Sequence, residues 1–168
     1  MKSTKPVVFF DIDYTLFDTA KFKQSGFLEH KIYKEVIGVL ENLKEIAVLG
    51  IFSEGDLEFQ TKKLIKTNIK KYFDEIHTYI VLDKFGEMKK VFEKYKNNKI
   101  FLVDDKLTIL RDLKKAMPLV FGIWIKRGWY ARNQKEILGF KPDAEVTSLK
   151  EVVNLILNTF ICAEYSVT

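Results

Sequence analysis

The chain has 168 residues, of which 47% are hydrophobic and 30% are charged; this size and composition fit one folded domain and exclude wholesale disorder. Its net charge is +5, but only three of its 28 cationic residues are Arg, the side chain that nucleic-acid readers use most for bidentate contacts. We therefore expect the lysines to form a solvated surface. A polyanion-binding face is the less favoured alternative.

No apolar stretch approaches the roughly 18 residues that a membrane-spanning helix requires, and the apolar run at 7–10 is too short for a signal peptide. Cys162 is the only cysteine, so no internal disulfide can form, as suits a reducing compartment. We therefore expect a cytoplasmic protein without membrane contact.

Apolar runs typical of buried strands alternate with amphipathic stretches from one end of the chain to the other. This alternation is typical of a parallel sheet with helices on both faces. We predict a Rossmann-like, doubly wound α/β sandwich with five or six mostly parallel strands, formed by one domain over 1–160 and followed by a frayed tail at 161–168. In the second predicted helix, Leu57, Leu64 and Ile65 are expected to face the core. In chain order the predicted strands are 6–12, 45–52, 75–82, 99–103, 119–125 and 144–146, and the predicted helices are 31–44, 56–68, 85–95, 107–113 and 148–158.

Polar side chains follow four of the predicted strands, at the edge of the sheet where ligands usually bind. Several carboxylates at one point repel one another and resist burial. A bound divalent cation is the simplest remedy, and oxygen ligands suit Mg²⁺. These side chains are Asp11 and Asp13 after the first strand, Ser53 after the second, Lys84 after the third, and Asp104 and Asp105 after the fourth.

Four segments resemble the four signatures of the haloacid dehalogenase-like hydrolases, in the expected order and each at the end of a predicted strand. They are FFDIDYTLFDT, GIFSEGD, LDKFGEM and IFLVDDK, and they span about 7–128. The first contains the DxDxT pattern as DIDYT at 11–15. The resemblance implies a hydrolase of this fold that binds Mg²⁺.

The resemblance also implies a role for each matching residue. Asp11 would attack phosphorus and form an aspartyl-phosphate, and Asp13 would act first as general acid and then as general base. Asp11, Asp104 and the backbone carbonyl of Asp13 would hold Mg²⁺, which would bridge the Asp11 carboxylate and the phosphate. Ser53 and Lys84 would stabilise the phosphoryl group.

Two further residues would support the site, and three assignments have alternatives. Asp105 would support the neighbouring metal ligand, and Thr15 would orient the loop that contains the nucleophile. Ser53 could instead cap the following helix, and Asp105 could be a helix N-cap. Lys89 could fill the role of Lys84.

Glu54, Arg127 and Gly128 are candidates for contact with substrate, because they follow strands at the same end of the predicted sheet. The acid at position 13 favours phosphate esters, since a halide leaving group needs no proton. We therefore expect a Mg²⁺-dependent phosphomonoesterase. The alternatives are a phosphotransferase or phosphomutase with the same chemistry, a non-catalytic binding module, and a receiver of the response-regulator kind, whose acids follow a different order.

Many hydrolases of this family have a cap domain, but the spacing of the motifs leaves no room for one here. After the predicted helix and strand are placed, only 16–30 remains between the first two signatures. This segment suffices for a flap, with Phe17, Phe22 and Phe27 as an apolar surface. We expect a capless, open site that could accept a macromolecular phosphorylated substrate or be closed by a homo-oligomer.

Overall fold

The computed structural model describes residues 5–164, with side chains described through 158. Its strands form one sheet in the order β3-β2-β1-β4-β5-β6, in which all neighbouring strands are parallel. The predicted parallel α/β fold is therefore confirmed, with the larger of the two predicted strand numbers. The strands are β1 (Val7–Phe10), β2 (Val48–Glu54), β3 (Thr78–Val81), β4 (Ile100–Asp104), β5 (Phe121–Ile125) and β6 (Ala144–Val146).

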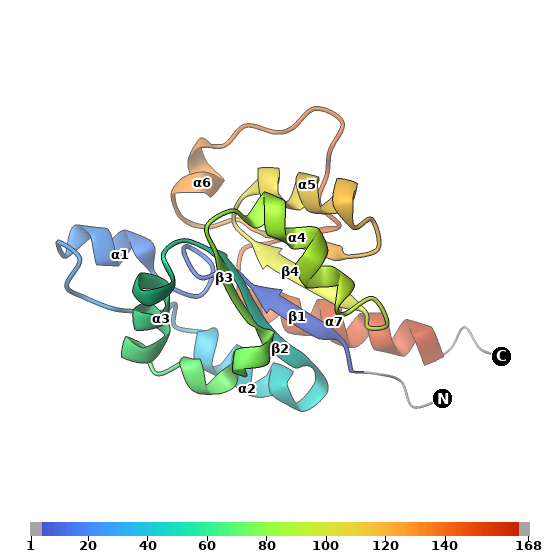
Figure 1. The fold of residues 1–168 in the computed structure, drawn as a ribbon, viewed down its shortest axis with the longest axis horizontal. Helices are drawn as coiled ribbons and strands as arrows, with labels where there is room; N and C mark the ends of the chain where they lie inside the picture. Colours follow the sequence, from blue (N-terminus) through green and yellow to red (C-terminus); the bar gives the residue numbers. More distant parts are fainter. Residues whose placement is uncertain (1–4, 165–168) are drawn as a thin grey trace.

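Helices cover both faces of the sheet (Figure 1). They are α1 (Thr19–Gln24), α2 (Val36–Ile46), α3 (Leu57–Lys66), α4 (Lys84–Glu93), α5 (Leu107–Ala116), α6 (Gly128–Asn133) and α7 (Leu149–Glu164), with 3₁₀ turns at Lys70–Tyr72 and Glu75–His77. Successive side chains of a strand point to opposite faces. Val8 and Phe10 of β1 accordingly pack with α2 and α7, whereas Val7 and Phe9 pack with α4 and α5. The central strand is thus buried on both sides.

The segment between β1 and α2 differs from its prediction. The helix predicted over 31–44 begins only at Val36, because Ile32 forms an antiparallel bridge with Phe17. This bridge joins the chain just after the predicted flap, 16–30, to Phe17 at the beginning of the flap. The flap also contains the short helix α1, which the apolar spacing does not predict.

The second half of the chain differs in two places. The six residues of α6 have no apolar period, so the sequence pattern does not predict this helix. Helix α7 continues to Glu164, so part of the predicted frayed tail is helical, and the remainder, 165–168, lies outside the described residues. Neither α7 nor any other described helix is long and apolar enough to cross a membrane.

Two short helices lie beyond the carboxyl ends of the strands. The connection from β1 to α2 holds α1, the connection from β5 to β6 holds α6, and the two helices contact each other (Figure 1). Between residues 5 and 164 there is no cap domain. Within this range, the carboxyl ends of the strands are therefore covered only by the two short helices α1 and α6.

Candidate active site

The carboxyl ends of β1, β2 and β4 bring four predicted site residues into contact. Asp11 directly follows β1, and Ser53 lies near the end of β2. Asp104 ends β4, and Lys84 begins α4. Ser53 Oγ donates to Asp11 Oδ1 over 2.9 Å, and Lys84 Nζ donates over 2.6 Å both to this oxygen and to Asp104 Oδ2. We call these four buried residues the floor of the site.

The electrostatics of the floor are dominated by burial. Burial raises the pKa of Asp11 to about 6, against the opposing effect of Lys84. Burial, reinforced by the Asp104 charge, raises the pKa of Asp105 to about 9. Burial alone would lower the pKa of Lys84, but Asp104 and Asp11 raise it above its usual value. Two buried acids, Asp11 and Asp104, therefore share one buried ammonium group, and a third, Asp105, lies beside them.

The structure also decides between the alternatives for Ser53 and for the site lysine. The side chain that caps α3 is that of Asp56, whose Oδ1 accepts a hydrogen bond from Phe59 N over 2.8 Å. Ser53 is therefore free of a capping role. The alternative lysine, Lys89, is exposed and lies 3.9 Å from Glu93 on the surface of α4.

The two predicted supporting residues are both buried beside the floor. The residue that precedes α5 is Lys106, whose backbone N–H donates to Asp104 Oδ1 over 2.8 Å, so Asp105 is not the N-cap. Among the described residues, Asp105 Oδ2 has no hydrogen-bond partner. Thr15 N donates to the carbonyl of Ile12 over 3.3 Å, which closes the loop after β1.

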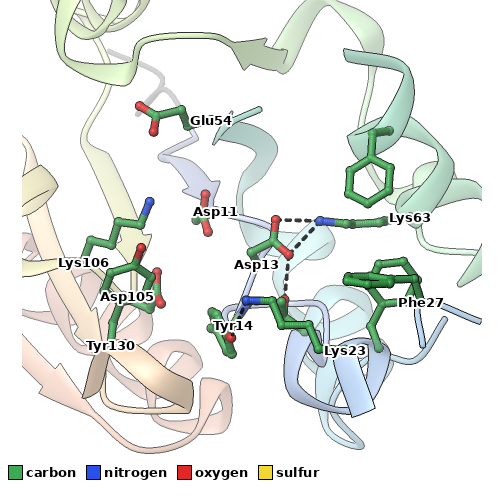
Figure 2. Close-up of a pocket in the computed structure, with 13 residues that line it drawn as sticks. Asp11, Asp13, Tyr14, Lys23, Phe27, Glu54, Lys63, Asp105, Lys106 and Tyr130 are labelled. Carbon is green, nitrogen blue, oxygen red and sulfur yellow. Dashed lines mark hydrogen bonds and ion pairs between the residues drawn. The ribbon is translucent and has the colours of Figure 1, made fainter. Parts of the chain in front are cut away.

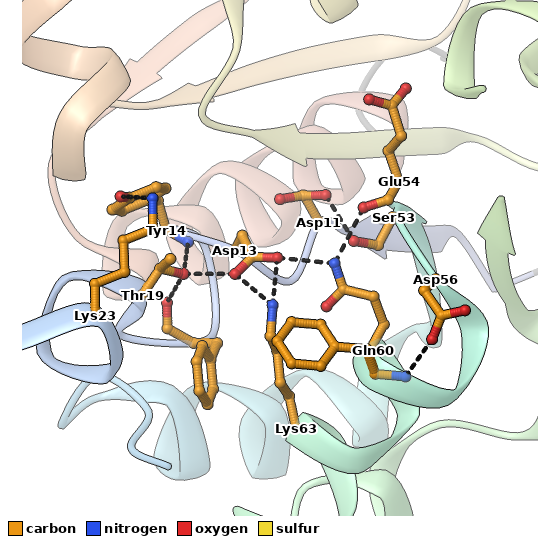
Figure 3. Close-up of polar contacts among 12 residues, drawn as sticks. Asp11, Asp13, Tyr14, Thr19, Lys23, Ser53, Glu54, Asp56, Gln60 and Lys63 are labelled. Atoms are coloured by element: carbon orange, nitrogen blue, oxygen red, sulfur yellow. Dashed lines mark hydrogen bonds and ion pairs between the residues drawn. The ribbon is translucent and has the colours of Figure 1, made fainter. Parts of the chain in front are cut away.

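Asp13 is held by residues from two helices (Figure 3). Lys63 Nζ lies 2.7 Å from each of its carboxylate oxygens, Gln60 Nε2 donates to Oδ2 over 2.8 Å, and Thr19 Oγ1 donates to Oδ1 over 2.6 Å. Burial would raise the pKa of Asp13, but Lys63, Thr19 and Gln60 together hold it below its usual value. The free protein therefore keeps this carboxylate ionised.

Helix α3 turns an unexpected face toward the site. The prediction that Leu57 and Ile65 face the core is wrong, since they are 63% and 55% exposed, and only Leu64 is buried as predicted. Gln60 and Lys63 are buried in their place. Their Gln-x-x-Lys spacing, which puts both on one face of a helix, is the signal that could have identified them as partners of an acid.

Two of the predicted substrate contacts have different surroundings. Glu54 lines the cavity of the site, and its Oε2 accepts a hydrogen bond from Lys84 N over 3.1 Å. The prediction for Arg127 requires correction. Its Nη2 lies 2.7 Å from Glu35 Oε1, and its guanidinium lies 4.2 Å from the centre of the Tyr33 ring. This buried pair holds Arg127 away from the residues that line the cavity.

The third predicted contact, Gly128, packs against Tyr14. Tyr14 lines the cavity with a backbone φ of 58°, a left-handed conformation that bulky residues rarely adopt. Gly128 has a φ of 75°, and a Cβ at this position would collide with the Tyr14 ring. Gly128 does not line the cavity itself; it makes room for a residue that does.

A cavity of about 280 Å³ opens above the floor (Figure 2). It is bounded by α1 and α3 on one side and by α6 on another, and its size suits part of a small ligand. Its lining residues are Asp11, Asp13, Tyr14, Thr19, Phe22, Lys23, Phe27, Glu54, Phe59, Lys63, Asp105, Lys106 and Tyr130.

The predicted metal ligands fit a divalent cation. The carboxylates of Asp11 and Asp104 and the backbone carbonyl of Asp13 are hard oxygen donors of the kind that Mg²⁺ prefers. This set has only two acidic side chains, and the described residues contain no cluster of three or more His, Cys, Asp or Glu side chains arranged for a metal. The excess of buried acid favours a cation, since Asp105 Oδ2 lies without a described hydrogen-bond partner beside two carboxylates that share one lysine.

The chain is similar to known proteins in fold. No family model matches it, and no curated protein sequence matches it. A provisionally assigned haloacid dehalogenase-like hydrolase from Burkholderia xenovorans LB400 has a TM-score of 0.78 and 21% identity, over 90% of this chain and 97% of that one. A provisionally assigned phosphatase from Clostridium difficile has a TM-score of 0.70 and 17% identity, over 92% and 100% of the two chains. The provisionally assigned HAD-hydrolase YfnB from Bacillus subtilis, bound to magnesium, has a TM-score of 0.67 and 15% identity, over 92% and 99%.

Proposed function

We propose that this chain, which has the fold of the haloacid dehalogenase-like hydrolases, is a Mg²⁺-dependent phosphomonoesterase of that family. The observation that carries the proposal is the state of the Asp11 carboxylate. Ser53 and Lys84 hold Oδ1, while no described residue donates a hydrogen bond to Oδ2. Asp11 also lines the cavity, so Oδ2 is available to a phosphate ester bound there. The magnesium in the YfnB structure and the phosphatase assignment of the Clostridium protein support the same reading.

In the first half of the proposed reaction, Asp11 Oδ2 forms a bond to phosphorus and the bond from phosphorus to the ester oxygen breaks. Asp13 gives a proton to the departing oxygen, so an alcohol leaves. The Lys84 ammonium and the Ser53 hydroxyl stabilise the charge that develops around Asp11 and the phosphoryl group. Bound Mg²⁺ would supply further neutralisation of the phosphoryl oxygens.

In the second half, a water molecule attacks phosphorus, Asp13 accepts its proton, and the bond to Asp11 breaks to release phosphate. The contacts of Asp13 suit this half directly, because they keep its carboxylate ionised and ready to accept a proton. The first half requires the protonated form. Approach of an anionic phosphate ester raises the pKa of a nearby carboxyl, which favours that form once substrate is bound.

Hydrolysis of nitrophenyl phosphate tests the proposal. We expect turnover by the parent protein with Mg²⁺, none with EDTA, and none by the Asp11→Asn variant. Asp74→Asn is the matched control, because Asp74 is exposed and lies outside the cavity. Acid-quenched parent protein should contain one phosphoryl group on the peptide that includes Asp11. Turnover that survives Asp11→Asn would exclude Asp11 as the nucleophile.

A further inference from the structure

Two of the lysines that line the cavity have no acidic partner. Lys63 and Lys84 are held by the carboxylates of the site. Lys23 and Lys106 line the cavity, as Lys63 does, yet no described carboxylate lies within 4.0 Å of either of their ammonium groups. Nothing in the described protein neutralises their charge at ion-pair distance.

Each of these two lysines lies against a tyrosine (Figure 2). Lys23 Nζ, from α1, lies 3.4 Å from the hydroxyl of Tyr14 and 5.7 Å from the centre of its ring. Lys106 Nζ, at the start of α5, lies 5.0 Å from the centre of the Tyr130 ring. The rings of Tyr14 and Tyr130 contact each other edge to face, with 6.2 Å between their centres. We call these four residues the lysine–tyrosine wall.

The backbone is strained to build this wall. Tyr14 adopts a left-handed φ of 58°, a strained conformation for a bulky residue and one that is found most often at functional sites. Gly128, which lies 114 positions away in the chain, leaves the space that the Tyr14 ring occupies. Two distant residues are thus matched so that the ring of Tyr14 faces the cavity.

Part of the cavity lining is apolar. Phe22 of α1, Phe27 of the flap and Phe59 of α3 line it, and the rings of Phe22 and Phe27 lie edge to face with 5.4 Å between their centres. The floor below is acidic and already contains its own lysine. Of the lysines that line the cavity, the two in the lysine–tyrosine wall are therefore the ones with no described carboxylate at ion-pair distance.

We infer that the substrate is a small phosphomonoester with a second anionic group, a carboxylate or a further phosphate, which Lys23 and Lys106 bind together. The inference rests on the proposed function and names the substrate class of the same site. An anion would receive charge-assisted hydrogen bonds from both ammonium groups, whereas a neutral alcohol group would bring no charge to compensate theirs. The cavity of about 280 Å³ is of a size that suits the polar part of such a molecule.

A matched pair of esters tests the inference: 2-carboxyethyl phosphate and propyl phosphate, which differ in the second anion. We expect the parent protein to favour the carboxyethyl ester by roughly 10- to 100-fold in kcat/KM, the value of a hydrogen bond to a charged group. Lys23→Ala and Lys106→Ala should each raise KM for this ester by about 10-fold and leave kcat and the kinetics of propyl phosphate almost unchanged. Lys21→Ala and Lys115→Ala are controls on the same two helices, since both lysines are exposed and neither lines the cavity.

Three outcomes would overturn the inference. A parent protein that does not distinguish the two esters has no site for a second anion. An equal loss toward both esters in the variants would place the lysines on the transferred phosphoryl group instead. Efficient hydrolysis of a phosphopeptide, with no preference for the carboxyethyl ester, would point to a macromolecular substrate.

A binding measurement separates this inference from the proposed function. Calorimetric titration with 3-phosphonopropionate and with propylphosphonate, in Mg²⁺, requires no turnover. Tighter binding of the phosphonopropionate, lost in Lys23→Ala and Lys106→Ala, would establish the anion site even if the protein hydrolysed no ester. Equal binding of the two phosphonates would exclude the site whatever the protein hydrolyses.

Discussion

The floor of the site and its lysine–tyrosine wall treat their charged groups differently. In the floor, the Lys84 ammonium lies 2.6 Å from two carboxylates and is almost completely buried. In the wall, the ammonium groups of Lys23 and Lys106 lie over aromatic rings and face the cavity. The charged groups of the floor are paired and positioned before any ligand binds, as electrostatic catalysis requires. The ammonium groups of the wall have no described carboxylate partner and can pair with an anionic ligand.

The two regions also have different structural supports. The floor is built on the ends of neighbouring parallel strands, whose backbones are fixed by hydrogen bonds along the sheet. The wall is built on the loop after β1, on the short helices α1 and α6, and on the residue that precedes α5. Substitutions in the floor should therefore affect folding and chemistry together, and substitutions in the wall should affect recognition more than stability.

The largest effect is expected from Lys84→Met. Removing one partner of a buried ion pair costs about 3 to 5 kcal/mol, because Asp11 and Asp104 would be left buried side by side without a cation. We expect urea titration of the metal-free variant to give a free energy of unfolding that is lower by this amount. The variant should also hydrolyse no ester. Lys89→Met is the control, since Lys89 lies on the exposed side of the same helix. Equal stability of the two variants would contradict the central place given to Lys84.

The next largest effect is expected from Asp13→Asn, because Asp13 is the residue that protonates the leaving group in the proposed reaction. Loss of a general acid lowers kcat by about 10²- to 10⁴-fold for propyl phosphate, whose alkoxide needs a proton. Nitrophenyl phosphate should lose much less in the step that breaks its ester bond, because nitrophenolate leaves without one. Rapid-quench measurement of phosphorylation with both esters checks this difference. Equal losses would contradict the assignment of Asp13 as the acid.

The same contrast explains how much the sequence reveals. Asp11, Ser53 and Asp104 follow strands with strong apolar patterns, so a parallel sheet alone places them at one edge. Lys63 could not be predicted in this way, because the apolar residues of α3 suggest another buried face and its partner, Asp13, lies 50 positions away. Arg127 was mispredicted for a related reason, since its direction is decided by Glu35, a residue 92 positions away.

A smaller effect is expected from Gly128→Ala, which tests how the wall is held. Both Gly128 and Gly139 have a φ of 75°, but an added Cβ would meet the Tyr14 ring only at Gly128. Alanine in the left-handed region costs about 1 to 2 kcal/mol, so Gly139→Ala measures that cost alone. We expect Gly128→Ala to lose about 1 to 3 kcal/mol more in urea unfolding, and to lose the preference for 2-carboxyethyl phosphate. Equal stability of the two variants would mean that Tyr14 moves without resistance.

The smallest effect is expected from Lys63→Met, which removes one of three contacts that hold Asp13. Gln60 and Thr19 would still donate to its carboxylate, so kcat should fall only about 10-fold, less than the loss of the acid itself.

Lys63 helps to hold the pKa of Asp13 below its usual value. Without it that pKa rises, and the acidic limb of the kcat profile should move to higher pH, because Asp13 must be ionised to accept a proton from water. Lys62→Met, one position earlier and exposed, should change neither value. An unshifted limb with reduced kcat would mean that Lys63 positions Asp13 without tuning its charge, and would make α3 a purely mechanical support of Asp13.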